Sequence, residues 1–158
     1  FVREKNDIIK LNSPIGLTFT ILHPQIEVKT SDSRALIKKI VSLEMMVKQS
    51  ANLGAFVSGL YTEDYELIGR SMKDLVIEPF RSILIPKFKQ IKSASINTGA
   101  IGCGISGSGP SIFALSKGLT TAKNVENAMK KIYDNLDLDY DVHVSRVNDK
   151  GIKIIKTL

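Results

Sequence analysis

Cysteine is nearly absent from this 158-residue chain, in which Cys103 stands alone. A single thiol excludes an internal disulfide framework and any zinc site built from several cysteines. It is also typical of a protein that works in the reducing cytoplasm. The two histidines lie far apart in the sequence, so we expect no other metal site in the chain.

Long apolar runs and clustered aromatic residues are also missing. No run of about 18 apolar residues occurs, which excludes a membrane-spanning helix, and the first ten residues, FVREKNDIIK, lack the apolar segment of a signal peptide. Aromatic residues make up 6% of the chain, and the 22 basic residues, which give a net charge of +6, are scattered. This pattern argues against nucleic-acid binding and is compatible with an anionic small-molecule ligand.

The residues that are present fit one soluble domain over 1–158, with 43% hydrophobic and 24% charged residues. Apolar spacing and turn residues predict strands followed by a block of helices, a strand-loop-strand unit, a helix and more strands. The expected strands are 7–11, 17–22, 142–147 and 152–155, and the expected helices are 30–43, 45–60, 62–75, one from Glu78–Pro79, 86–95 and 121–136. This order predicts an α+β fold, a mainly antiparallel sheet covered on one face by helices.

A glycine-rich stretch over 99–118, GAIGCGISGSGPSIFALSKG, is the most distinctive part of the chain. Glycines allow a positive φ and let a ligand approach the backbone, and successive N–H groups in such a loop can bind an anion. The alternative is a tight turn between two strands with no ligand. Composition alone leaves both interpretations open.

Three stretches together resemble the homoserine kinases, a branch of the GHMP family of small-molecule kinases. They are HPQIEVKTSDSR (23–34), DLVIEPFRSILIPKF (74–88) and GAIGCGISGSGPSIFAL (99–115). The resemblance implies a ferredoxin-like C-terminal domain. It also implies transfer of the ATP γ-phosphate to the hydroxyl of L-homoserine in threonine biosynthesis, in a cytoplasmic enzyme whose relatives commonly form homodimers.

The resemblance covers only the C-terminal half of such an enzyme. Nothing in this sequence is similar to the family's earlier phosphate loop, Pro-x-x-x-Gly-Leu-Gly-Ser-Ser-Ala, and the first residue is Phe. We therefore expect a C-terminal domain that binds ATP and Mg²⁺ mainly through the absent half, and that is inactive alone.

Substrate-binding residues carry over by position. Arg34 and Arg81 match the family's substrate-binding arginines, and arginine suits bidentate recognition of a carboxylate. Both are expected near helix starts, where backbone donors favour an anion. Thr30 matches a position that lines the substrate pocket. In the glycine-rich loop, Ser106, Gly107, Ser108 and Gly109 are the expected contacts for substrate or phosphate.

Other interpretations remain at each position. Arg34 and Arg81 suit surface ion pairs, Thr30 suits a helix cap, and Glu78 suits either a cap or a partner that orients Arg81. His23 precedes a proline at a strand end, which favours a structural role, so no catalytic residue is assigned. For the whole chain, the alternatives are another GHMP kinase acting on mevalonate or a sugar, or a non-catalytic ligand-binding module.

Overall fold

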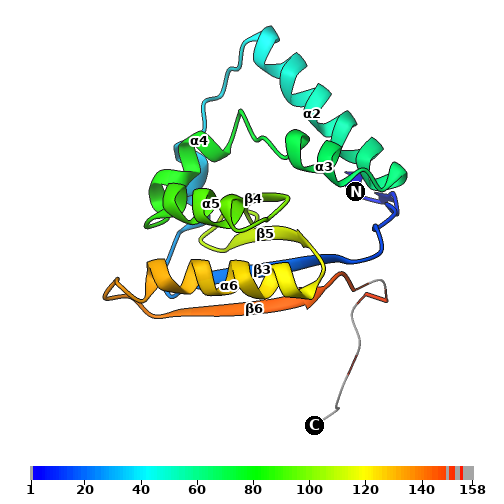
Figure 1. The fold of residues 1–158 in the computed structure, drawn as a ribbon. Coiled ribbons are helices and arrows are strands. Elements are labelled where there is room, and N and C mark those ends of the chain that lie inside the picture. Colours follow the sequence, from blue (N-terminus) through cyan, green and yellow to red (C-terminus); the bar gives the residue numbers. More distant parts are fainter. Residues whose placement is uncertain (1, 149, 152–153, 155–158) are drawn as a thin grey trace.

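A four-stranded antiparallel sheet forms the centre of the computed structural model, which describes residues 2–148, 150–151 and 154 (Figure 1). The strands are β1 (Val2–Glu4), β2 (Asp7–Ile8), β3 (Leu17–Pro24), β4 (Gly102–Ile105), β5 (Ile112–Lys117) and β6 (Tyr140–Arg146). The helices are α1 (Thr30–Ala35), α2 (Leu43–Thr62), α3 (Tyr65–Ser71), α4 (Glu78–Arg81), the 3₁₀ turn η1 (Ser82–Leu84), α5 (Phe88–Asn97) and α6 (Leu119–Tyr133).

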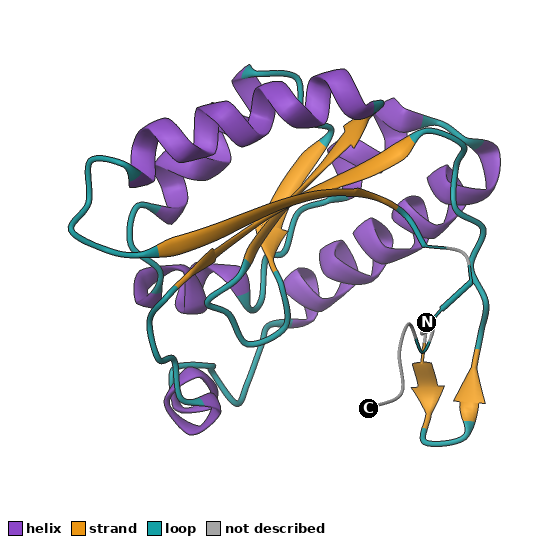
Figure 2. Ribbon diagram, turned by 90° about the horizontal axis from the view of Figure 1, so that it is seen from below, coloured by secondary structure: helices purple, strands orange, loops and turns teal. Residues whose placement is uncertain are grey.

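The strand order in the main sheet is β4–β5–β3–β6, and every neighbouring pair is antiparallel. Counted from β3, this is the order 2-3-1-4, which is that of a ferredoxin-like β-α-β-β-α-β unit. The α+β class and the antiparallel sheet are therefore confirmed. β1 and β2 form a separate hairpin that stands to one side of the sheet (Figure 2).

Helices α5 and α6 cover one face of the sheet. Side chains alternate along a strand, so every second residue of β3 faces these helices. Thr20 donates a hydrogen bond to the Ala122 carbonyl of α6 at 2.9 Å, and Leu22 is fully buried. Ile91 of α5 and Met129 of α6 are likewise fully buried in this core. The sequence predicted a sheet with one face covered by helices, and α5 and α6 form such a cover.

The opposite face is covered in part, by α3 and the C-terminal end of α2. Phe19 and Phe113 lie on this face with ring centroids 6.3 Å apart, and they pack with Leu60 of α2 and Ile68 of α3. Figure 1 shows the N-terminal part of α2 rising away from the sheet. Helices therefore lie on both sides of the sheet (Figure 2).

Tyr133 anchors the end of α6 to the loop before α5, because its hydroxyl donates to the Pro86 carbonyl at 2.7 Å. Burial raises the pKa of Tyr133 from 10.0 to about 12. An unfolded tyrosine loses its proton first, so this contribution to stability is full below pH 10.0 and is lost as the pH rises to about 12. Burial also raises the pKa of Tyr140 to about 12.

We therefore expect the free energy of unfolding to fall as the pH rises above 10.0, and to fall less steeply in Tyr133→Phe. Urea titrations at several pH values measure both slopes. The variant should lose about 1 kcal/mol at neutral pH, with the hydrogen bond. Equal slopes in the two proteins would contradict the assignment.

The helix expected over 30–43 is wrong in its second half. α1 ends at Ala35, and residues 36–42 form no helix. Ile40 is 85% exposed, so the apolar spacing that suggested a continued helix buries nothing at this position. Ser42 instead begins α2, where its hydroxyl accepts a hydrogen bond from the Met45 amide at 3.2 Å.

Thr62, expected to cap the third helix, is the last residue of α2 and donates to the Ser58 carbonyl. Glu63 follows in the left-handed region (φ 55°) and separates the two helices. Asp64 caps α3, since its carboxylate accepts from the Leu67 amide at 2.9 Å. α3 ends at Ser71, four residues before the expected end.

The strand-loop-strand unit, α6 and β6 agree with the prediction to within a few residues, whereas β1, which pairs with β2, was not predicted. The strand expected over 152–155 lies mostly outside the described residues. Of the helices that the structure describes, none has the length and hydropathy that a bilayer span requires.

Candidate functional site

The glycine-rich stretch is a hairpin. β4 and β5 pair antiparallel, and the loop between them is closed where the Ser106 amide donates to the Ser111 carbonyl at 2.8 Å. Gly107 (φ 60°) and Gly109 (φ 84°) take the left-handed conformation that glycine favours. In the described part of the chain, the amides of Gly107 and Ser108 donate to no acceptor. The loop is thus a tight turn whose tip keeps two adjacent donors for a ligand.

Arg81 reaches this loop from α4. Its Nη1 donates to the Gly107 carbonyl at 2.7 Å. Its Nε is fully buried and has no hydrogen-bond partner among the described residues. A buried donor without an acceptor is costly, so the guanidinium keeps capacity for an acceptor that a ligand could supply. Arg81 and the predicted loop contacts are therefore brought together.

α1 reaches the same loop from the other side. The Ser33 hydroxyl donates to the Ser108 carbonyl at 3.2 Å, and Ser33 is fully buried. Lys38, just after α1, lies over the Phe80 ring of α4, 5.6 Å from its centroid. α1 and α4 thus contact consecutive residues of the loop, and all three resemblance stretches meet there.

Arg34 and Thr30 are both exposed on α1, next to this junction. Neither side chain makes a hydrogen bond or an ion pair within the described part of the chain. The helix begins after Lys29 without a side-chain cap, so Thr30 is not the cap that one interpretation allowed. Both residues are exposed on the helix that carries Ser33, and within the described residues neither side chain contacts the loop through a hydrogen bond or an ion pair.

α1 has six residues and α4 has four, so each arginine lies within about one turn of its helix start and at the same time in the last turn. Helices this short align few peptide dipoles and contribute little to binding an anion. Any anion binding at this junction rests on the side chains and on the amides of the loop.

The His23 side chain contacts the end of the glycine-rich hairpin. Its Nδ1 lies 2.7 Å from the Ser111 hydroxyl, which joins the end of β3 to the end of the glycine-rich loop. Among the described residues, the His23 side chain makes no other hydrogen bond.

A cavity of about 430 Å³ adjoins the loop, between α2 and the uncovered part of the sheet. One side is apolar and includes Phe19, Phe56 and Phe113. The other side is polar and includes Asp74 and Arg81. Burial raises the pKa of Cys103, in the cavity wall, to about 12, so its thiol stays protonated.

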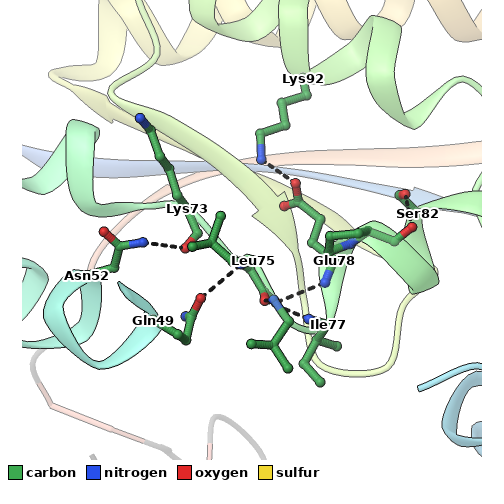
Figure 3. Close-up of polar contacts among 11 residues, drawn as sticks. Gln49, Asn52, Lys73, Leu75, Ile77, Glu78, Ser82 and Lys92 are labelled. Carbon is green, nitrogen blue, oxygen red and sulfur yellow. Dashed lines mark hydrogen bonds and ion pairs between the residues drawn. The ribbon is translucent and has the colours of Figure 1, made fainter. Parts of the chain in front are cut away.

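The chain between α3 and α4 is held by side-chain acceptors. Gln49 of α2 accepts from the Leu75 amide at 2.9 Å. Asp74 accepts from the three following amides, those of Val76 (2.9 Å), Ile77 (2.8 Å) and Glu78 (3.1 Å). Four consecutive N–H groups are therefore satisfied without regular secondary structure (Figure 3). We call residues 73–78 the capping segment.

Glu78 pairs with Lys92 of α5, not with Arg81. The Lys92 ammonium lies 2.5 Å from the Glu78 carboxylate, and the two side chains point toward each other (Figure 3). Within the described residues, the Glu78 carboxylate makes no hydrogen bond or ion pair with Arg81.

Sequence reasoning missed four residues of this site: Ser33, Gln49, Asp74 and Lys92. Asp74 carried the only signal visible in the sequence, because Asp side chains in turns accept hydrogen bonds from backbone amides a few residues on. The other three act through contacts distant in the sequence. Within the described residues, no group of three or more His, Cys, Asp or Glu side chains could hold a metal ion.

Comparison with known proteins identifies the family. The family model described as GHMP kinases C terminal matches residues 46–135, more than half of the chain. The homoserine kinase of Chlorobium phaeobacteroides is 46% identical over 151 residues, and that of Chlorobaculum tepidum is 42% identical over 153. These alignments cover 94% and 96% of this chain but 47% of each relative, so the chain spans about half the length of the curated relatives it matches.

Solved structures agree. The crystal structure of homoserine kinase from Cytophaga hutchinsonii matches with a TM-score of 0.92 and 47% identity, over 95% of this chain and 48% of that one. Phosphomevalonate kinase of Streptococcus pneumoniae matches with a TM-score of 0.64 at 16% identity, over 85% of this chain and 41% of that one, which indicates a shared fold alone. The chain therefore belongs to the GHMP kinase family, and what it contains is that family's C-terminal domain.

Proposed function

We propose that this chain is the homoserine-binding C-terminal domain of an ATP-dependent homoserine kinase. The observation that carries the proposal is the contact of Arg81 with the tip of the glycine-rich loop, in a chain similar to homoserine kinases over nearly its whole length. The complete enzyme would transfer the ATP γ-phosphate to the hydroxyl of L-homoserine, a step of threonine biosynthesis.

The site suits an amino-acid substrate. Homoserine carries a carboxylate, which Arg81 and Arg34 can bind through charge-assisted hydrogen bonds. Thr30 offers a hydroxyl beside them, and the amides of Gly107 and Ser108 offer two donors that suit a carboxylate or a phosphate. Phosphoryl transfer depends mainly on positioning and on stabilising charge, so a domain that orients the acceptor contributes directly to the rate.

ATP and Mg²⁺ are assigned mainly to the half of a homoserine kinase that this chain does not span. A cytoplasmic location and a homodimer stay predictions, the first from the single cysteine and the second from the resemblance.

The test is an assay of the full-length protein that contains this chain, with ATP and one of three acceptors: homoserine, mevalonate or galactose. We expect kcat/KM for homoserine to exceed that for the others by at least about 100-fold, because a site built to hydrogen-bond one substrate leaves polar groups unpaired with another. Preference for mevalonate or galactose would favour another GHMP kinase. The 158-residue chain alone serves as the control and should show no turnover.

A further inference from the structure

We propose that Glu78 and Lys92 are positioning residues of the substrate site, whose ion pair fixes the start of α4 and with it the guanidinium of Arg81. The inference rests on the proposed function, in which Arg81 binds the substrate carboxylate. Among the described residues, neither side chain forms a hydrogen bond with residues 106–109 of the loop, so both would act through Arg81.

α4 cannot hold its own position. It has four residues, too few to be stable as a helix without outside contacts. The capping segment supplies contacts on the side of α2, through Gln49 and through Asp74, whose carboxylate accepts from the amide of Glu78. Those contacts fix the backbone that enters α4.

Glu78 supplies the second fixed point. Its Oε1 pairs with Lys92 of α5 at 2.5 Å. Its Oε2 packs against β4, 3.5 Å from where a Cβ on Gly104 would lie. α5 and β4 both belong to the buried core, so the first residue of α4 is tied to the rigid part of the domain.

Arg81 follows Glu78 by three residues, so the two side chains project from the same side of α4. A rotation of α4 about the capping segment would therefore move Arg81 away from the Gly107 carbonyl, now 2.7 Å from its Nη1. The ion pair prevents that rotation.

The burial of the pair favours a positioning role over simple stabilisation. The side chain of Glu78 is 16% exposed and that of Lys92 is 30% exposed. Removing two charges from water at this depth costs about as much as their attraction returns, so such a pair adds little net stability. The pair instead fixes the orientation of the first residue of α4.

The test uses steady-state kinetics of the full-length protein with Lys92→Met, which keeps the apolar stem, and Glu78→Gln, which keeps the shape. We expect each to raise the KM for homoserine about tenfold, because a small displacement of a binding group costs a large part of its contribution. The value of kcat and the KM for ATP should change less than about twofold. Lys89→Met, exposed on the same helix, is the matched control and should leave all three constants unchanged.

The double variant Glu78→Gln/Lys92→Met distinguishes an effect of the ion pair from separate effects of its two residues. If the two residues act together, its KM for homoserine should match that of either single variant. Unchanged KM in the single variants, additive effects, or equal changes in the KM for ATP would overturn the proposal. If Lys92→Met does not fold, Glu78→Gln decides alone. Failure of the proposed function is a separate result, seen when Arg81→Ala leaves the KM for homoserine unchanged.

Discussion

Replacing Arg81 with alanine is expected to raise the KM for homoserine about 100-fold in the full-length protein, with a smaller effect on kcat. A charge-assisted hydrogen bond contributes about 1.5–3 kcal/mol, and a bidentate contact to a carboxylate adds geometric specificity. Most of the lost binding energy should show as a higher KM for homoserine, because the substrate carboxylate is bound equally in the ground state and in the transition state. Steady-state kinetics with homoserine varied at saturating ATP measures the effect.

Arg70→Ala is the matched control, because Arg70 is exposed on α3 and pairs with Glu66 at the surface. It should leave both constants unchanged, since surface pairs of this kind contribute little. Arg81→Lys should recover only part of the loss, because an ammonium cannot form two parallel hydrogen bonds with a carboxylate. If Arg81→Ala and Arg34→Ala both leave the KM for homoserine unchanged, the assignment of these arginines to the carboxylate is wrong.

Gly69→Ala should lower the free energy of unfolding by about 2 kcal/mol, although alanine favours helix formation by about 1 kcal/mol over glycine. A Cβ at Gly69 would lie 2.6 Å from the Ile101 carbonyl oxygen. That backbone cannot easily move, because the Ile101 amide donates to the Leu115 carbonyl of β5 at 2.7 Å. α3 would therefore have to move away from the sheet.

Gly54→Ala is the control, because it makes the same substitution at a helix position where the added Cβ has room. Gly54 is exposed within α2, and a Cβ there would meet nothing within 4 Å. The variant should gain up to about 1 kcal/mol from helix propensity alone. Urea denaturation gives both values from the midpoints, provided the slopes agree. Stabilisation by Gly69→Ala would show that α3 is not packed closely against the backbone before β4.

The sequence predicted most elements correctly, and it failed where a local signal competed with a tertiary one. The apolar residues Ile40 and Val41 have helical spacing with α1, yet they are exposed and outside any helix. Thr62 is a good capping residue, but the left-handed Glu63 moves the break to Asp64. Local propensity is weak, and burial of an apolar face decides which turns of a helix form.

The amino-acid sequence by itself determined the α+β class, the hairpin at the glycine-rich loop and the similarity to GHMP kinases. These follow from short-range spacing, from turn residues and from motifs that can be read along the chain. It also singled out Arg81 and the loop residues 106–109, which the structure brings together.

Only the tertiary structure decided how that site is held. Three contacts each join residues from separate elements, between 14 and 75 positions apart. They are the Arg81–Gly107 and Ser33–Ser108 hydrogen bonds and the Glu78–Lys92 ion pair. No local pattern encodes such contacts, because they form only when packing on the sheet brings those elements together. The sequence names the groups that can bind an anion, and the packing of α1, α4 and α5 around one hairpin gives them their geometry.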